Sequence, residues 1–481
     1  MHMRTKNVQD AQLDFLVSAM HHGLFMSTQD ILIWMTQRNN EVISDISQIP
    51  LVELKGWSLQ DDRIKHCSGK FFSIDGIHVN TNYRDIPEWD QPIINQPEIG
   101  FLGFIVKKFS GVMHFLMQAK IEPGNLNVVQ LSPTLQATRS NYTRVHGGKS
   151  PTYLEYFNGE KDVIVLVDQL QSEQGARFLH KRNRNIIVEV DEDEEFVVED
   201  NFIWVSLGQI KELLRYPNVI NMDSRTVISC IKFGSYSESS LRLLSAIKGI
   251  LGLSSPKSDS FLYSVLSSDN HLHDLQDIIQ WITSLKFKYE LDVKPIGISE
   301  MNHWIYDGNI ICHEEGKYFD VIGCRVEIGN REVISWDQPM VRSAQEGLMG
   351  FIVKKINGIY HFLVQAKLES GNFDIIELAP TVQCLTGNYR KGKNEYTIPY
   401  LEEILHSPKD KVWYSSYQSE EGGRFYQEQN LNIIVEVGDE FPIEVESNYC
   451  WMTLNQLLSF VTYNNYLNIA ARSLLSAISF Y

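Results

Sequence analysis

Hydrophobic positions along the chain follow two different periods, which predict a mixture of helices and strands. Residues 28–38 and 275–285 carry apolar side chains at helical spacing and predict two amphipathic helices. Residues 101–108 and 112–120 are apolar runs on either side of a Phe-Ser-Gly turn, which predicts a β-hairpin. The same hairpin pattern returns later in the chain around an Ile-Asn-Gly turn.

Four further segments complete the predicted order of elements. Residues 128–131 and 185–190 predict strands, and residues 204–214 and 223–231 predict closing helices. Strands and helices mix without a strict alternation. We therefore expect an α+β fold with mixed sheets flanked by helices.

An internal repeat determines the organisation of the chain. Gly103-Phe-Ile-Val-Lys-Lys108 recurs as Gly350-Phe-Ile-Val-Lys-Lys355, an offset of 247 residues. At that offset, positions 101–136 share 20 of 36 residues with 348–383. A period this long indicates a duplicated domain rather than a solenoid, whose units run about 20–50 residues.

The matching between the repeats stops in a Ser/Gly/Pro-containing stretch, which suits an exposed connection. We expect a first repeat over residues 1–233, a linker over 234–260 and a second repeat over 261–481. A short apolar helix is predicted within this linker, over residues 241–251.

Composition and charge exclude several classes of protein. The 481 residues include 43 basic and 60 acidic side chains, and the net charge of −17 argues against non-specific nucleic-acid binding. Six scattered cysteines form no C-x-x-C pair, and such sparse cysteine fits a reducing compartment. No apolar run reaches the roughly 18 residues of a membrane span, and the polar start lacks the apolar core of a signal peptide. We expect a cytoplasmic protein.

The richest candidate for ligand binding is the polar segment 130–148. It contains two arginines, a histidine, several hydroxyls and a Gly-Gly pair. Arginine forks bind phosphate bidentately, and hydroxyls add neutral donors, so a diphosphate site is one interpretation and a solvated loop is the other. Thr134, Gln136, Asn141 and Tyr142 have identical partners in the second repeat, at Thr381, Gln383, Asn388 and Tyr389. Arg139 is replaced by Thr386. The residues unique to the first repeat are better candidates for chemistry.

Other candidates have equally plain structural interpretations. Trp89 and Trp336 can stack a base or sugar, or simply pack. Arg424 can bind a phosphate or form an ion pair, and Glu122, at a strand end, can be a base or a turn acceptor. The chain has no Walker loop, no Gly-x-Gly-x-x-Gly after a strand, no His-Glu-x-x-His and no Gly-x-Ser-x-Gly, so the corresponding nucleotide, redox, metal and serine-hydrolase chemistries lose support.

With these motifs the sequence resembles the NDP-hexose 2,3-dehydratase family. The resemblance rests on residues 101–125, 130–148 and 153–157 and on their counterparts in the second repeat, and it covers nearly the whole chain. It implies a duplicated fold related to Nudix hydrolases, a homodimer, and a dTDP-4-keto-6-deoxyhexose substrate processed without a cofactor. It also implies a catalytic pocket in the first repeat, a second and possibly vestigial nucleotide-sugar pocket, and functional coupling to a 3-ketoreductase. The glutamate-rich Nudix box is missing, which argues against metal-dependent diphosphate hydrolysis.

Within this resemblance the site residues fall into three expected groups. The catalytic acid and base are sought among His146, Tyr142 and Glu122. Substrate contacts in the first repeat are expected from Arg139, Arg144, Ser140, Asn141, Thr143, Thr134, Gln136 and Trp89. The second pocket is expected to use Trp336, Thr381, Gln383, Thr386, Asn388, Tyr389 and Arg424.

Two other functions fit the same sequence. A non-catalytic nucleotide-sugar binding protein would use both pockets for sensing or assembly. A Nudix-type hydrolase would need an unusual metal site.

Overall fold

The computed structural model describes residues 3–42, 44–83, 86–138, 151–250, 256–329, 335–385 and 397–480. In the first repeat the helices and strands are β1 (Met3–Thr5), α1 (Val8–Ala19), α2 (Thr28–Glu41), β2 (Ser44–Ile49), β3 (Trp57–Gln60), β4 (Arg63–His66), β5 (Ser73–Thr81), β6 (Glu88–Asn95), β7 (Gly100–Phe109), β8 (Val112–Ile121), β9 (Val129–Ser132), β10 (Leu135–Ala137), β11 (Val163–Ser172), β12 (Arg182–Glu189), β13 (Phe202–Ser206), α4 (Leu207–Leu213) and α5 (Met222–Ser229).

The connection and the second repeat follow the same order. They comprise α6 (Glu238–Ile250), α7 (Pro256–Leu266), α8 (Leu275–Lys288), β14 (Leu291–Ile296), β15 (Trp304–Tyr306), β16 (Ile310–His313), β17 (Phe319–Ile328), β18 (Ser335–Ser343), β19 (Gly347–Ile356), β20 (Ile359–Lys367), β21 (Glu377–Ala379), β22 (Val382–Leu385), α10 (Leu401–Leu405), β23 (Val412–Ser419), β24 (Gln429–Glu436), β25 (Tyr449–Thr453), α11 (Leu454–Phe460) and α12 (Ile469–Ser476).

Each repeat is built on a large mixed sheet. In the first repeat the order is β1-β11-β12-β7-β8-β13, and in the second the matching strands run β23-β24-β19-β20-β25. β12 pairs with β7 in parallel, as β24 does with β19, whereas the β7–β8 and β19–β20 hairpins are antiparallel. The predicted hairpins, the α+β class and the duplication are confirmed.

The smaller sheets exchange strands between the repeats. β14 of the second repeat pairs with β5 of the first, and β2 of the first repeat pairs with β17 of the second. Each repeat therefore completes a sheet of the other, so their relative position is fixed by backbone hydrogen bonds.

The predicted helix over residues 204–214 is partly wrong. Trp204 lies in β13, opposite Leu116 of β8, and the helix α4 begins only after Ser206. The aromatic and β-branched run before Ser206 suits a strand. Ser206 then starts the helix with a capping box, in which its hydroxyl accepts from the Gln209 N–H and the Gln209 side chain accepts from the Ser206 N–H.

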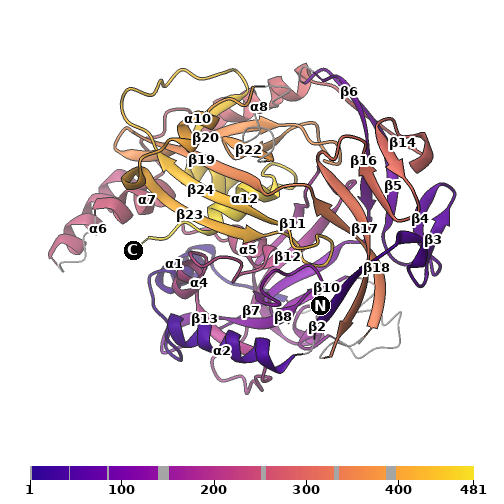
Figure 1. Cartoon of the computed structure of the whole chain (residues 1–481). Coiled ribbons are helices and arrows are strands. Elements are labelled where there is room, and N and C mark those ends of the chain that lie inside the picture. Colours follow the sequence, from indigo (N-terminus) through magenta and orange to yellow (C-terminus); the bar gives the residue numbers. More distant parts are fainter. Residues whose placement is uncertain are drawn as a thin grey trace.

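The two large sheets meet through a central pair of helices (Figure 1). α5 packs against α12, and each also contacts the large sheet of its own repeat. Two fully buried arginines reinforce this junction. Arg225 of α5 donates to the carbonyl of Ser419, and Arg472 of α12 donates to the carbonyl of Ser172. Each arginine therefore binds backbone of the other repeat. The two repeats also share one hydrophobic core, because buried apolar side chains of both belong to a single cluster.

The segment between the repeats is helical. α6 lies where the sequence predicts a short apolar helix, and it extends from the body of the molecule (Figure 1). α7 packs on β20, where Ser264 donates to the carbonyl of Tyr360 at 2.5 Å, much as Ser18 of α1 donates to Met113 at 2.6 Å. In the described part of the chain, no helix has the length and apolar character needed to cross a bilayer.

Candidate active site

A buried carboxylate lies at the end of β8 in the first repeat. Glu122 directly follows this strand and is 5% exposed. Gln136 of β10 donates its Nε2 to Glu122 Oε1 at 2.8 Å. Asn221, the N-cap residue of α5, donates in turn to Gln136 Oε1 at 3.1 Å. This relay fixes the orientation of the carboxylate.

The second repeat contains the same relay. Gln383 donates to Glu369 at 3.0 Å, and Asn468 donates to Gln383 at 2.8 Å. Lys120 and Lys367 each donate to the backbone carbonyl of the relay glutamine of their own repeat at 3.1 Å. The relay is therefore a feature of the duplicated fold, and it does not by itself distinguish an active repeat from an inactive one.

A loop of the second repeat closes over the carboxylate of the first. Residues 421–424 pack against residues 122–125, where the Gly124 N–H donates to the Gly422 carbonyl at 2.7 Å. The Gln427 N–H donates back to the Gly124 carbonyl at 2.9 Å. This close backbone approach requires residues without a side chain. A Cβ placed on Gly422 would lie 2.1 Å from Oδ1 of the Asn125 side chain.

The same loop contact occurs with the two repeats exchanged, around Glu369 of the second repeat. Residues 174–177 of the first repeat pack against residues 369–372 of the second, where the Gly371 N–H donates to the Gly175 carbonyl at 2.6 Å. We call the residues around Glu122 the first cluster (Glu122, Gln136, Asn221, Asp223, Glu421 and Arg424). The second cluster comprises Glu369, Gln383, Asn468, Gln174 and Arg177. Each cluster combines side chains from both repeats.

Two carboxylates converge in the first cluster. A Cβ built on Gly423 would lie 3.1 Å from Glu421 Oε1 and 3.5 Å from Glu122 Oε1. Burial raises the pKa of Glu421 to about 7, although attraction to Arg424 opposes this shift. A carboxyl group with a pKa in this range can both release and accept a proton near neutral pH.

A third carboxylate, Asp223, comes from the first turn of α5 and is 3% exposed. Burial raises its pKa well above the usual range. Repulsion from Glu421, Glu122 and Glu173 adds to this shift, and attraction to Lys120 opposes it. The first cluster therefore retains protons that isolated carboxylates would lose at neutral pH.

Arg424 is the half-buried cation beside these acids. Burial lowers the pKa of its guanidinium, and Glu421, Glu122 and other nearby carboxylates oppose that shift. The guanidinium lies 4.1 Å above the ring of Phe72, and its Nε donates to Gln96 Oε1 at 3.2 Å. It is held in place and lies where an anionic ligand or a developing enolate can be stabilised.

The two clusters differ at the residues that titrate. At the 247-residue offset, Asp223 corresponds to Ala470 and Glu421 corresponds to Gln174. The candidates from the sequence included neither acid. A position-by-position comparison of the repeats carries the signal that would have found them, because both are acidic in one copy and neutral in the other.

Thr134 and Thr381 have equivalent places within the sheets. The Thr134 hydroxyl donates to the Leu116 carbonyl at 2.5 Å and accepts from the Ile105 N–H at 2.9 Å. Thr381 makes the same contacts at the same distances in the second repeat. Both hydroxyls are thus engaged in joining strands of their own sheet.

The structure places the two tryptophans and Arg424 across the repeat boundary. Trp89 donates to Gln91, which donates to the carbonyl of Ala176, within the loop that closes the second cluster. Trp336 donates to Gln338, which donates to the carbonyl of Gly423 beside the first cluster. Trp89 is thus next to the second cluster, and Trp336 and Arg424 belong with the first, opposite to the grouping expected from the sequence.

The remaining predicted residues lie outside the described residues. They are Arg139, Ser140, Asn141, Tyr142, Thr143, Arg144 and His146 in the first repeat and Thr386, Asn388 and Tyr389 in the second.

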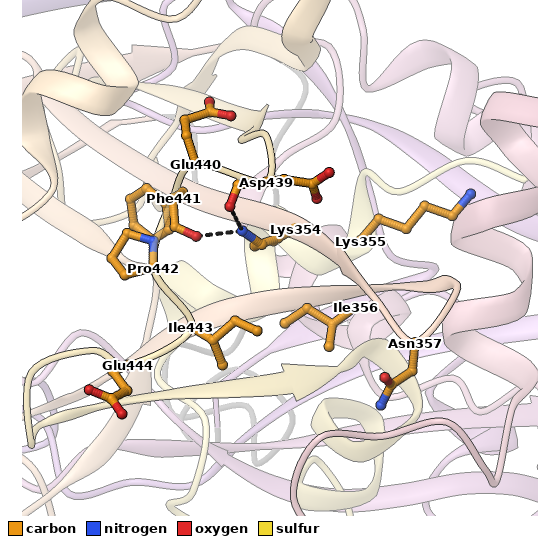
Figure 2. A pocket seen from close by; sticks show the side chains of 10 residues that line it. All are labelled: Lys354, Lys355, Ile356, Asn357, Asp439, Glu440, Phe441, Pro442, Ile443 and Glu444. Carbon is orange, nitrogen blue, oxygen red and sulfur yellow. Dashed lines mark hydrogen bonds between the residues drawn. The ribbon is translucent and has the colours of Figure 1, made fainter.

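A separate cavity of about 570 Å³ lies in the second repeat, between the β19–β20 turn and residues 439–444 (Figure 2). One of its two lysines, Lys354, donates to the carbonyls of Gly438 at 2.9 Å and Asp439 at 3.1 Å, and also to that of Phe441. With three carbonyl partners this ammonium group holds the loop in place. The cavity is lined by neither Glu122 nor Glu369, so it is separate from both clusters.

Within the described ranges, no group of three or more His, Cys, Asp or Glu side chains is arranged to hold a metal ion.

Comparison of the sequence with known proteins identifies the family of this chain. A model of the NDP-hexose 2,3-dehydratase family matches residues 28–231 and again residues 275–478, so the chain belongs to this family. Three similar proteins are each named dTDP-4-dehydro-6-deoxy-α-D-glucopyranose 2,3-dehydratase. The protein from Saccharopolyspora spinosa is 42% identical over 94% of this chain and 91% of its own length. The protein from Amycolatopsis orientalis is 38% identical over 96% of this chain and 93% of its own length. The protein from Streptomyces violaceoruber is 40% identical over 92% of this chain and 95% of its own length.

Proposed function

We propose that this protein catalyses the 2,3-dehydration of dTDP-4-keto-6-deoxyglucose. The observation that carries the proposal is the family match over both repeats, together with full-length relatives named for this reaction. The protein is a sugar-nucleotide 2,3-dehydratase, and the carbon–oxygen lyase activity predicted from the sequence is confirmed.

The chemistry follows from the position of the ketone. The C3 proton of a 4-keto sugar is acidic because its removal gives an enolate on the C4 oxygen. The C2 hydroxyl is β to that carbonyl and can leave as water. Ketonisation of the resulting C3 enol gives a 3,4-diketo-2,6-dideoxy sugar. The reaction involves no net redox change, and it requires a base at C3, an acid at the leaving hydroxyl and a donor to the C4 oxygen.

Glu122 is the described residue best suited to be the base. It is buried, and its carboxylate is oriented by Gln136 and Asn221. Arg424, whose pKa responds to Glu122, is a cation suited to stabilise charge on the C4 oxygen.

Residues of segment 139–146 have proposed roles that rest on the family resemblance and their chemistry. We assign Arg139 and Arg144 to the diphosphate and Ser140, Asn141 and Thr143 to the hexose hydroxyls. His146 and Tyr142 remain the alternatives to Glu122 as acid or base, and histidine has the more suitable unperturbed pKa.

We assign catalysis to the repeat over residues 1–233 and a second nucleotide-sugar pocket to the repeat over 261–481. Support comes from the differences between the clusters, since Asp223 and Glu421 of the first are replaced by Ala470 and Gln174 in the second. The second cluster keeps the relay and an arginine, which suit binding, but lacks these two acids. Its further contacts are assigned to Thr386, Asn388 and Tyr389.

The family resemblance also suggests a fold relationship, an oligomeric state and a location for this protein. We propose that each repeat is related to the Nudix hydrolase fold, that the subunits form a homodimer and that the protein is cytoplasmic. The 3,4-diketone product is labile because its C1 nucleotide is β to the new C3 ketone. Functional coupling to a 3-ketoreductase would prevent this loss.

The proposed function is tested with purified protein and dTDP-4-keto-6-deoxyglucose, without added metal or nicotinamide. We expect enzyme-dependent release of dTDP, because the diketone eliminates its nucleotide spontaneously. A 3-ketoreductase with NADPH should suppress this release by trapping the diketone. Tight binding of an intact substrate would instead support the binding-protein alternative.

A further inference from the structure

Glu421 of the first cluster corresponds to Gln174 of the second cluster, so the two clusters have an acid and an amide at the same position. In the second cluster Gln174 donates to the Glu420 carboxylate, so the two side chains satisfy each other. The counterpart of Glu420 in the first cluster is Glu173, and the residue facing it is Glu421. A carboxyl group there can provide a donor only when it carries a proton.

Asp223 provides a second, independent observation at the same place. Its side chain is 97% buried, yet the described part of the chain provides no hydrogen bond to its carboxylate. Its electrostatic neighbours include Glu421 and Glu122, so it lies near the carboxylates that converge beside Gly423. A buried polar group without a partner is costly unless a ligand supplies one. The cluster is therefore suited to hold a polar molecule.

The groups around Glu421 favour the retention of a proton. The acids Glu173 and Glu122 repel its charged form, whereas Arg424 and Lys181 attract it. Buried like charges cannot all ionise at once. Gln136 donates to Glu122, whereas burial and the neighbouring acids favour the protonated form of Glu421 beside it.

We propose that Glu421, a residue of the second repeat, is the acid that protonates the departing C2 hydroxyl at the first cluster. The inference rests on the proposed dehydratase function and adds that the catalytic pocket is incomplete without the second repeat. Asp223, which lies near Glu421, is a second buried carboxyl group of the cluster, and its pKa is raised by burial and by the charge of Glu421.

The proposed steps balance without any other reagent. Glu122 removes the C3 proton, and the C3–H electron pair forms the enolate. The enolate pair then forms the C2–C3 double bond, the C2–O bond breaks, and Glu421 transfers its proton to the oxygen, so that water leaves. Glu421, now ionised, accepts the proton of the C3 enol hydroxyl, and Glu122, whose proton has exchanged with solvent, protonates C2. Both carboxyl groups end in their starting states.

The decisive variant is Glu421→Gln, assayed with two substrates. Loss of the acid should lower kcat for the 2-hydroxy substrate about 100-fold or more, the scale of general acid catalysis. The 2-deoxy-2-fluoro analogue loses fluoride without protonation and gives the same enol, so its turnover should fall only a few-fold. Retained turnover of the analogue also shows that the variant is folded. In D₂O the variant should still exchange the C3 proton of the 2-hydroxy substrate, because Glu122 is intact.

Three results would overturn the inference. Wild-type turnover of the 2-hydroxy substrate by the variant would remove Glu421 from the reaction. Equal losses with both substrates, or loss of C3 exchange, would mean that Glu421 acts at an earlier step or only in folding. Adding Gln174→Glu to Glu421→Gln should restore no activity, and recovery would place the reaction at the second cluster. Failure of the proposed function itself is distinguishable, because the wild-type protein would then release no dTDP.

Discussion

Closure of the first cluster by the second repeat depends on a close backbone approach at Gly124, which the substitution Gly124→Ala would disrupt. A Cβ on Gly124 would lie 1.6 Å from the carbonyl oxygen of Phe425. A carbon and an oxygen normally approach to about 3.3 Å, so the two loops must separate by roughly 1.7 Å. Because the opposing atom belongs to the backbone, no side-chain rotation relieves the clash. The loop that carries Glu421 and Arg424 must move.

The size of the effect follows from this displacement. A misplacement of about 1 Å can lower catalysis roughly 100-fold, so we expect kcat/KM of Gly124→Ala to fall by about that factor. This corresponds to about 2.7 kcal/mol of lost transition-state stabilisation. Overpacking should also lower the free energy of unfolding by about 1–3 kcal/mol. Activity is therefore measured as dTDP release per folded molecule, after denaturant unfolding curves have given the folded fraction.

The chain provides a matched control in the pseudo-symmetric glycine. A Cβ on Gly371 would lie 1.9 Å from the carbonyl oxygen of Phe178, beside the second cluster. Gly371→Ala should therefore lower stability by a similar amount but leave kcat per folded molecule near the wild-type value. Equal losses of activity in both variants, or full activity in Gly124→Ala, would refute the assignment of catalysis to an inter-repeat first cluster.

Three further predictions concern buried charges. Burial raises the pKa of Glu377 to about 7, so Glu377→Gln, which copies Gln130 of the first repeat, should stabilise the protein by about 3 kcal/mol at pH 8. This gain should vanish below pH 4.5, since the acid is then protonated in both states; pH-independent unfolding curves would contradict it. Arg225→Met should lower the free energy of unfolding by about 3 kcal/mol or more, because the Ser419 carbonyl and other acceptors lose buried donors. A loss below about 1 kcal/mol would contradict a stabilising role for these hydrogen bonds. Since Glu421 must be protonated to act, kcat/KM should fall as pH rises above about 7, and this limb should be absent in Glu421→Gln; a profile unchanged by the substitution would refute its titration.

Much of each repeat can be predicted from the sequence because its signals are local. The β7–β8 hairpin is marked by apolar runs around a short turn, and the duplication is marked by a constant offset. The error at Trp204 has a local cause as well. The strand β13 runs directly into α4, so the apolar pattern of the helix continues into the strand across the capping residue Ser206.

The arrangement between the repeats could not be predicted in this way. A constant offset shows that two units are alike, but not which surfaces meet. The contact that closes the first cluster joins the backbone of Gly124 to that of Gly422, so no side-chain pattern marks it. Arg424 was grouped with its own repeat for the same reason, although the structure places it beside Glu122.

The most direct test of 2,3-dehydration follows the fate of the C2 position. The protein is incubated with dTDP-4-keto-6-deoxyglucose in D₂O, with a 3-ketoreductase and NADPH to trap the product, and the sugar is analysed by NMR. The account predicts a 2-deoxy sugar whose C2 methylene carries one deuterium, because that position is protonated from solvent-exchangeable groups after water leaves. A trapped sugar that retains its C2 hydroxyl, with substrate otherwise unchanged, would contradict the account.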